Sequence, residues 1–280
     1  MKIDRYPPQE PLSPLGQKYQ ARVMALGEGL QGQEARYGED PYQSLAVFPA
    51  ERPGADVLLF FHGGGWTSGY KEWMAFMAPA FNALGVTFVS AGYRLAPQHV
   101  FPVGLDDCAE AVAWVSKHLP GRVFVGGHSA GGHYAALLAV TSAWRAARGL
   151  AVDVLAGCLP VSGVYRFGPD SGMAQRPRFL GPVEDGQAEV AASPLAQLVR
   201  PESAAACPPF LVTWGEKDFP HLAVQGRQFT AALQAAGVPV ATDVLPGCDH
   251  FEASITAGQS EGGWPARAAR WMHDTTGGRR

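Results

Sequence analysis

Residues 123–133 read VFVGGHSAGGH, and they predict a strand, a tight turn and a helix in that order. The strand is the apolar run 123–125, and a run of small and apolar residues at 135–140 continues the helix. The turn holds Ser129 between Gly127 and Gly131, with the Gly-x-Ser-x-Gly spacing of a nucleophile elbow. The serine backbone is strained in such an elbow, and glycines two positions away avoid a clash and leave the hydroxyl exposed. The stretch therefore predicts a reactive serine at the end of a sheet strand.

A second glycine motif comes earlier in the chain. The continuous apolar run 57–61 is typical of a strand buried on both faces, and it leads into His62-Gly63-Gly64-Gly65-Trp66. Backbone N–H groups can approach a reacting carbonyl closely where side chains are absent. We therefore expect the amides of Gly63, Gly64 and Ala130 to form an oxyanion hole, and a flexible loop is the alternative. In a chain with 34 glycines, one such motif alone is weak evidence for a catalytic site. The two motifs together, in this order, favour a catalytic serine with an oxyanion hole over a flexible loop.

Strands and helices alternate along the chain. Apolar runs at 57–61, 86–90 and 123–125 are separated by helical patterns at 73–84 and 101–118, and further strands are predicted at 154–159, 209–214 and 240–245. This order predicts an α/β fold with a mostly parallel central sheet and helices on both faces. Residues 43–47 predict a short edge strand, and Asp106 and Asp107 are interpreted as acidic residues that complement the start of a helix.

Three regions are distinguished by composition. Residues 1–40 are rich in proline, glycine and glutamine, which predicts an extended or partly helical N-terminal arm that either lies across the domain as a partial cap or is loosely ordered. Residues 41–280 are expected to form a single domain. Within it, the stretch 167–205 holds several prolines and glycines, and it predicts a short cap insertion of one or two helices.

Composition narrows the choice of partners. The net charge is −3 without a basic run, so we expect no nucleic-acid partner. Four scattered cysteines give no metal-binding spacing. Residues 1–8 lack the apolar core of a signal peptide, and no apolar run approaches membrane-spanning length, so we expect a cytoplasmic protein without a membrane partner. Composition does not indicate the oligomeric state, and a homodimer remains open.

Two further polar residues follow late strands. Asp218 comes after the strand at 209–214, and its carboxylate should share the sheet edge with Ser129; Glu216 is the alternative acid. His250 follows the last strand directly, and its neighbour Asp249 is a less favoured acid. The order serine, acid, histidine is that of α/β-hydrolases, in which the histidine moves the proton and the acid orients the imidazole.

Other residues near the motifs are given supporting roles. His62 is interpreted as a loop anchor, His128 and His133 as packing residues, and His221 as a residue at the mouth of the site. Four aromatic residues make an aryl-containing substrate plausible, although aromatic residues also serve core packing: Trp66, Tyr165, Phe219 and Phe251.

The motifs together resemble those of a known superfamily. Residues 62–66, the stretch Gly92-Tyr93-Arg94-Leu95-Ala96-Pro97 and residues 127–133 are similar to the α/β-hydrolases, in particular to hormone-sensitive-lipase-like esterases and kynurenine formamidases (arylformamidases). The segments 162–165, 214–220 and 248–252 resemble the formamidase side. The chain departs from the formamidase pattern at the middle glycine of residues 62–66, where an aromatic is common, and along 167–202. The resemblance implies a serine hydrolase with Ser129, Asp218 and His250 as its triad, and the departures put the substrate in doubt.

The sequence thus predicts acyl transfer from a small substrate to water, which requires neither a metal nor an organic cofactor. An aryl ester, amide or formamide is slightly favoured as substrate, and a broad short-chain carboxylesterase is the alternative. A non-catalytic ligand receptor on the same fold is a third possibility, although such proteins usually lose a member of the triad.

Overall fold

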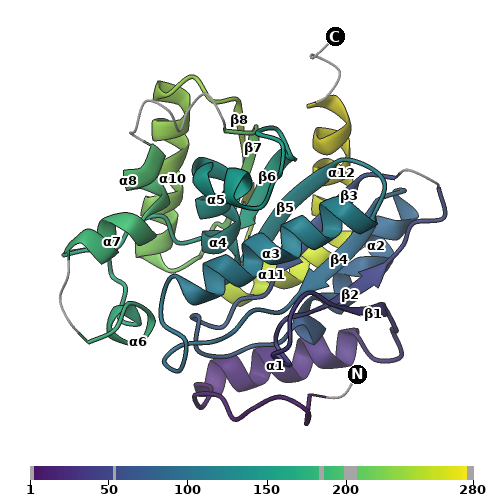
Figure 1. Ribbon diagram of the computed structural model, residues 1–280, viewed down its shortest axis with the longest axis horizontal. Helices are drawn as coiled ribbons and strands as arrows, with labels where there is room; N and C mark the ends of the chain where they lie inside the picture. Colours follow the sequence, from purple (N-terminus) through teal and green to yellow (C-terminus); the bar gives the residue numbers. More distant parts are fainter. Residues whose placement is uncertain (1–2, 53–54, 183–185, 199–206, 276–280) are drawn as a thin grey trace.

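The computed structural model describes residues 3–52, 55–182, 186–198 and 207–275, and Figure 1 shows its arrangement of helices around a central sheet. The strands are β1 (Gln33–Arg36), β2 (Ser44–Phe48), β3 (Val57–Phe61), β4 (Thr87–Ala91), β5 (Val123–His128), β6 (Leu155–Val161), β7 (Phe210–Gly215) and β8 (Val240–Leu245). The helices of the first half are α1 (Pro14–Leu26), the 3₁₀ helix η1 (Lys71–Met77), α2 (Ala78–Ala83), α3 (Val103–His118), α4 (Ala130–Val140) and α5 (Ala143–Ala147). Those of the second half are α6 (Arg176–Phe179), α7 (Gly186–Ala192), α8 (Pro194–Leu198), α10 (Pro220–Ala235), α11 (His250–Gly258), the 3₁₀ helix η2 (Ser260–Gly262) and α12 (Trp264–Asp274).

The described strands form one eight-stranded sheet with the order β1-β2-β4-β3-β5-β6-β7-β8. Along β4-β3-β5-β6-β7-β8 every neighbouring pair is parallel, whereas β2 pairs antiparallel with both β1 and β4. Parallel neighbours joined by helical crossovers bring the carboxyl ends of β3, β5, β6 and β7 to the same edge. The predicted α/β class with a mostly parallel sheet is confirmed.

Both faces of the sheet are covered. Along β3, Val57, Leu59 and Phe61 pack into one buried cluster, whereas Leu58 and Phe60 pack into another. Because side chains alternate along a strand, a strand covered on both faces is apolar at every position, which explains the continuous run at 57–61. Helices α3, α4 and α10 cover one face, while η1, α2, α11 and α12 cover the other (Figure 1).

Two local predictions are corrected. The edge strand is β1, and β2, predicted as the edge, lies between β1 and β4. The residues Gln33–Arg36 are mostly polar and exposed, so they carry no apolar alternation that would signal a strand. The helix predicted at 73–84 is divided into η1 and α2 at Ala78, because Pro79 lacks an N–H and its ring would clash in the interior of one continuous helix.

Asp107 also differs from its prediction. Only Asp106 lies in the first turn of α3 on the solvent side, whereas Asp107 is 1% exposed. Its carboxylate accepts hydrogen bonds from Arg94 Nε at 2.9 Å and Arg94 Nη2 at 2.7 Å, and from Gln43 Nε2 at 2.8 Å. Asp107 therefore joins α3 to the loop after β4 through an ion pair whose carboxylate is buried and whose guanidinium is partly exposed.

The N-terminal arm is held on the face that carries η1. Glu72 is buried and accepts hydrogen bonds from Tyr6 Oη at 3.0 Å, Lys71 Nζ at 2.7 Å and Arg5 Nη2 at 2.9 Å. Farther along the arm, Gln9 bonds both the N–H and the C=O of Gly69, each at 2.8 Å. The arm is thus tied to the segment that follows the His62–Trp66 motif.

In the described part of the chain no helix is long and apolar enough to cross a membrane.

Candidate active site

Ser129 lies at a strained turn between β5 and α4. Its φ of 54° and ψ of −116° are rare for a residue with a side chain, and its N–H donates a hydrogen bond of 2.9 Å to Val161 O on the neighbouring strand. A Cβ on Gly127 would lie 2.3 Å from the carbonyl carbon of Gly131, and one on Gly131 would lie 2.1 Å from Phe61 O. The two glycines of the elbow motif are therefore required by close backbone contacts.

A hydrogen-bonded chain joins Ser129 to the two other predicted residues. His250 Nε2 lies 3.0 Å from Ser129 Oγ, and His250 Nδ1 lies 2.9 Å from Asp218 Oδ1. Both His250 and Asp218 are 6% exposed. An ionised carboxylate only accepts hydrogen bonds, so His250 Nδ1 carries the proton and Nε2 is free to accept one from the serine hydroxyl. This is the arrangement that a serine nucleophile with a histidine base requires.

The surroundings of Asp218 favour its ionised form. Burial alone would raise the pKa of this carboxyl, but the hydrogen bond and charge of His250, followed by the hydrogen bonds from Ser162 Oγ and Phe219 N, hold it below its ordinary value. The Phe219 N–H donates to Oδ1 at 2.7 Å, and the Ser162 hydroxyl donates to Oδ2. A carboxylate that accepts several hydrogen bonds remains charged and can stabilise a protonated imidazole.

The glycine-rich loop lies beside the Ser129 side chain. A Cβ on Gly63 would lie 3.3 Å from Ser129 Cβ, and one on Gly64, where φ is 113°, would lie 1.9 Å from Ser68 O. The Gly64 carbonyl accepts hydrogen bonds from Thr67 N, Ser68 N and Ser68 Oγ, which fixes the turn. Among the described residues, the amides of Gly63 and Gly64 have no protein acceptor, and neither has that of Ala130 in the first turn of α4. These three N–H groups are thus available to an anionic oxygen near Ser129.

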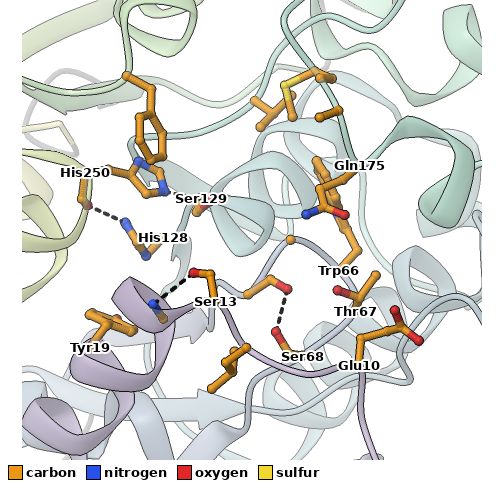
Figure 2. Close-up of a pocket in the computed structure, with 18 of the residues that line it drawn as sticks. Glu10, Ser13, Tyr19, Trp66, Thr67, Ser68, His128, Ser129, Gln175 and His250 are labelled. Carbon is orange, nitrogen blue, oxygen red and sulfur yellow. Dashed lines mark hydrogen bonds between the residues drawn. The ribbon is translucent and has the colours of Figure 1, made fainter.

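His128, the residue before Ser129, supports the backbone of His250. Its Nε2–H donates a hydrogen bond of 2.9 Å to the backbone carbonyl of His250, and the two rings lie 4.7 Å apart between centroids (Figure 2). Burial, followed by the charge of His250, lowers the pKa of His128 to about 3. His128 is therefore a neutral donor that holds the backbone of His250 without competing for its proton.

A cavity of about 350 Å³ opens at Ser129 and His250. Three of the four predicted substrate-contacting aromatics line it: Trp66, Phe219 and Phe251. Phe219 also stacks on the His250 ring at 4.7 Å. The structure does not bring Tyr165 to this cavity, because its ring lies 4.3 Å from Phe229 and packs between the sheet and α10.

Residues that the sequence did not single out form the other walls of the cavity. Figure 2 shows Ser13 and Tyr19 of the N-terminal arm and α1 on one side, and Gln175 beside Trp66 and Thr67 on another. Glu10 and Arg178, from the arm and the predicted cap stretch, line the rim and approach each other to 3.5 Å. The spacing of Tyr19 and Val23, four residues apart and both buried, is the sequence signal that could have identified the buried face of α1.

The alternatives weighed for the acid lie elsewhere. Glu216 is exposed and accepts a hydrogen bond of 2.7 Å from Gly247 N, and Asp249 caps α11 by accepting from Phe251 N and Glu252 N. Residues 183–185 and 199–205 of the predicted cap stretch lie outside the described residues.

Three other histidines given supporting roles from the sequence, His62, His133 and His221, lie outside the hydrogen-bonded chain. His62 is buried, hydrogen-bonded to Gly63 O at 2.7 Å and stacked on Tyr93, and burial lowers its pKa to about 4. His133 accepts a hydrogen bond from Trp66 Nε1 at 3.1 Å, and burial lowers its pKa to about 4 as well. His221 lines the cavity. Within the described ranges, no group of three or more His, Cys, Asp or Glu residues could hold a metal ion.

Comparison with known proteins places this geometry in a family. The family model described as "alpha/beta hydrolase fold" matches residues 58–253. Esterase LipC of Mycobacterium tuberculosis is 32% identical over 243 residues, which are 76% of this chain and 58% of that protein. Carboxylesterase NlhH of the same organism is 38% identical over 99 residues, 32% of this chain and 31% of that protein. A kynurenine formamidase of Danio rerio is 28% identical over 224 residues, 77% of this chain and 73% of that protein.

Solved structures show the same fold at lower identity. The carboxylesterase EstE1 from a metagenomic library superimposes with a TM-score of 0.74 at 20% identity, covering 94% of this chain and 98% of the other. The chain spans about a third of NlhH and less than two thirds of LipC, so it matches only part of these relatives. The resemblance expected from the motifs is thus confirmed by the family match, which covers both glycine motifs and the three residues of the hydrogen-bonded chain: this chain belongs to the α/β-hydrolase fold family.

Proposed function

We propose that the protein is a serine hydrolase that cleaves a small ester, amide or formamide by a Ser129–His250–Asp218 triad. The observation that carries the proposal is the continuous chain of hydrogen bonds of 3.0 and 2.9 Å from Ser129 through His250 to Asp218, beside three backbone amides that have no acceptor in the described part of the chain. These groups have the types and order of contacts that acyl transfer to water requires.

The reaction follows from these positions. Ser129 Oγ attacks the substrate carbonyl carbon while His250 Nε2 takes its proton, and the negative oxygen is bound by the amides of Gly63, Gly64 and Ala130. The tetrahedral species collapses to an acyl-enzyme when His250 returns the proton to the leaving group. Water then attacks the acyl carbon with His250 as base, and release of the acid restores Ser129.

The cavity favours a substrate with an aryl group. Phe219 and Phe251 offer aromatic surface in the cavity that opens at Ser129, the buried Trp66 lies in its wall, and about 350 Å³ suits a compact molecule. Similarity to a kynurenine formamidase supports an aryl formamide, and similarity to esterase LipC supports a broad short-chain carboxylesterase as the second candidate. The triad and the oxyanion hole serve both reactions. We further propose that the arm at 1–40 and the short insertion at 167–205 act as a partial cap on one domain at 41–280, to whose sheet the arm also contributes the strand β1.

The test is a comparison of hydrolysis rates for N-formylkynurenine and p-nitrophenyl acetate, with Ser129→Ala as the blank. A kcat/KM much higher for the formamide supports the formamidase, whereas activity on the ester alone supports the carboxylesterase. Covalent labelling by an organophosphate tests the serine mechanism independently of the substrate. A well-folded protein that resists this reagent would favour the non-catalytic receptor.

A further inference from the structure

Ser162 stands at the end of β6 in the way that Ser129 stands at the end of β5. The two residues have φ values of 51° and 54°, a region that residues with side chains rarely adopt. Each donates its N–H to the next strand of the sheet, Ser129 to Val161 O at 2.9 Å and Ser162 to Thr213 O at 2.8 Å. A strained backbone of this kind costs free energy, so it persists only where the surrounding structure enforces it.

The Ser162 side chain faces Asp218. Its hydroxyl donates a hydrogen bond to Asp218 Oδ2, and Ser162 is only 2% exposed. The other oxygen, Oδ1, already accepts from His250 Nδ1 and Phe219 N. The remaining contact of Oδ2 is with Gly215 N at 3.4 Å, which is long for a hydrogen bond. Among the described residues, Ser162 is therefore the closest hydrogen-bond donor to Asp218 Oδ2.

The turn that carries Ser162 is itself anchored. Gln225 on α10 accepts hydrogen bonds from Tyr165 N at 2.8 Å and Arg166 N at 2.9 Å. Tyr165 folds back on this turn, since a Cβ on Gly163 would lie 2.8 Å from Tyr165 Oη. The residues 162–165 thus hold the Ser162 hydroxyl in place, and of this turn Val164 also lines the cavity.

We propose that Ser162 is a positioning residue of the triad: its hydroxyl fixes the plane of the Asp218 carboxylate so that Oδ1 faces His250. This inference rests on the proposed function. The terminal torsion of an aspartate is broad, and a carboxylate held through one oxygen can turn about its Cβ–Cγ bond. Holding Oδ2 as well restricts this rotation, which keeps His250 in one orientation and one tautomer. Such orientation is what the acid of a serine triad supplies.

The experiment compares Ser162→Ala and Ser162→Gly with Ser90→Ala. Both Ser162 variants lose the hydroxyl, and only glycine relieves the positive φ, so together they separate the hydrogen bond from the backbone strain. Ser90 is a matched control, because it is buried at the carboxyl end of β4 and its hydroxyl donates to Lys71 O, away from Asp218. We expect both Ser162 variants to lower kcat on p-nitrophenyl acetate about ten- to a hundredfold with KM within about twofold, the loss expected for a hydrogen bond to a charged group.

A spectroscopic readout keeps the inference separate from the proposed function. The proton on His250 Nδ1, shared with Asp218, should give a far-downfield NMR resonance in the parent protein whether or not p-nitrophenyl acetate is its substrate. We expect this resonance to shift or broaden in both Ser162 variants and to stay in place in Ser90→Ala. An unchanged resonance, a kcat within about twofold of the parent, or a loss that Ser90→Ala reproduces would overturn the role of Ser162. A parent without hydrolytic activity but with a resonance that responds to Ser162 would contradict only the proposed function.

Discussion

Tyr19 on α1 and Ser254 on α11 share a buried hydrogen bond of 2.7 Å between their hydroxyl oxygens. The helix α11 begins at His250, so this bond joins the N-terminal arm to the element that carries the proposed base. The Tyr19 ring also lines the cavity and lies 5.9 Å from the His128 ring. The arm thus contributes both to the wall of the cavity and to the support of α11.

Tyr19→Phe removes this bond while keeping the ring in the cavity wall. Ser254 is 1% exposed, so its hydroxyl would lose a buried partner, and we expect the free energy of unfolding to fall by about 1–3 kcal/mol. Chemical denaturation measures this change, and Leu15→Ala on the same helix, where Leu15 is 58% exposed, is the control that should change little. Equal losses in the two variants would show that the bond to Ser254 contributes nothing specific.

Gly131→Ala should be far more damaging than Gly186→Ala. The added Cβ would lie 2.1 Å from Phe61 O, and backbone on both sides leaves no flexible atom to move. We expect a loss of both activity and several kcal/mol of stability, since relaxation must move β3 or α4. The control is Gly186→Ala, where nothing lies within 4 Å of the added carbon. Thermal unfolding followed by circular dichroism measures the melting temperatures of the two variants. Similar melting temperatures would contradict the role assigned to the elbow glycine.

The sequence allowed the elbow and the sheet to be predicted because each has a strict local cause. A strand buried on both faces must be apolar throughout, as β3 is, and the backbone contacts at Gly127 and Gly131 exclude any side chain. These constraints are visible in a few adjacent residues. The three residues of the hydrogen-bonded chain could be placed because parallel strands bring their carboxyl ends to one edge, and the family resemblance favoured Asp218 over Glu216.

The contacts of the arm, the burial of Asp107 and the edge strand β1 could not be predicted in the same way. Tyr19 meets Ser254 across 235 positions, and Asp107 is buried because Arg94 reaches it from another loop. Such contacts depend on tertiary packing and leave no periodic signal. The strand β1 forms because β2 offers it a free edge, although its own residues are polar.

His128→Gln should flatten the acid side of the stability profile. The pKa of His128 is lowered to about 3 by burial and by His250, whereas the ordinary value for histidine is about 6.5. Below about pH 6.5, His128 therefore becomes protonated in the unfolded chain while it stays neutral in the folded chain. The stability that neutral His128 contributes is therefore complete above pH 6.5 and is lost progressively as the pH falls towards 3. A glutamine amide can still donate to His250 O but does not titrate. Denaturation at pH 7 and pH 5 should show a smaller loss in the variant, and an equal loss would contradict the assignment.

Phe219→Ala should separate substrate binding from folding. Phe219 is 42% exposed, lines the cavity and stacks on His250, so its removal takes aromatic surface from the substrate at little cost to the core. We expect KM for an aryl ester to rise about tenfold, as the loss of an aromatic contact of 0.5–1.5 kcal/mol plus buried area implies, with a smaller rise for a small aliphatic ester. Tyr165→Phe is the matched control, because Tyr165 packs on Phe229 away from the cavity and should leave both KM values unchanged. A KM that rises equally for aryl and aliphatic esters would argue against an aryl subsite at Phe219, and a change in Tyr165→Phe would show that the turn at 162–165 reaches the substrate.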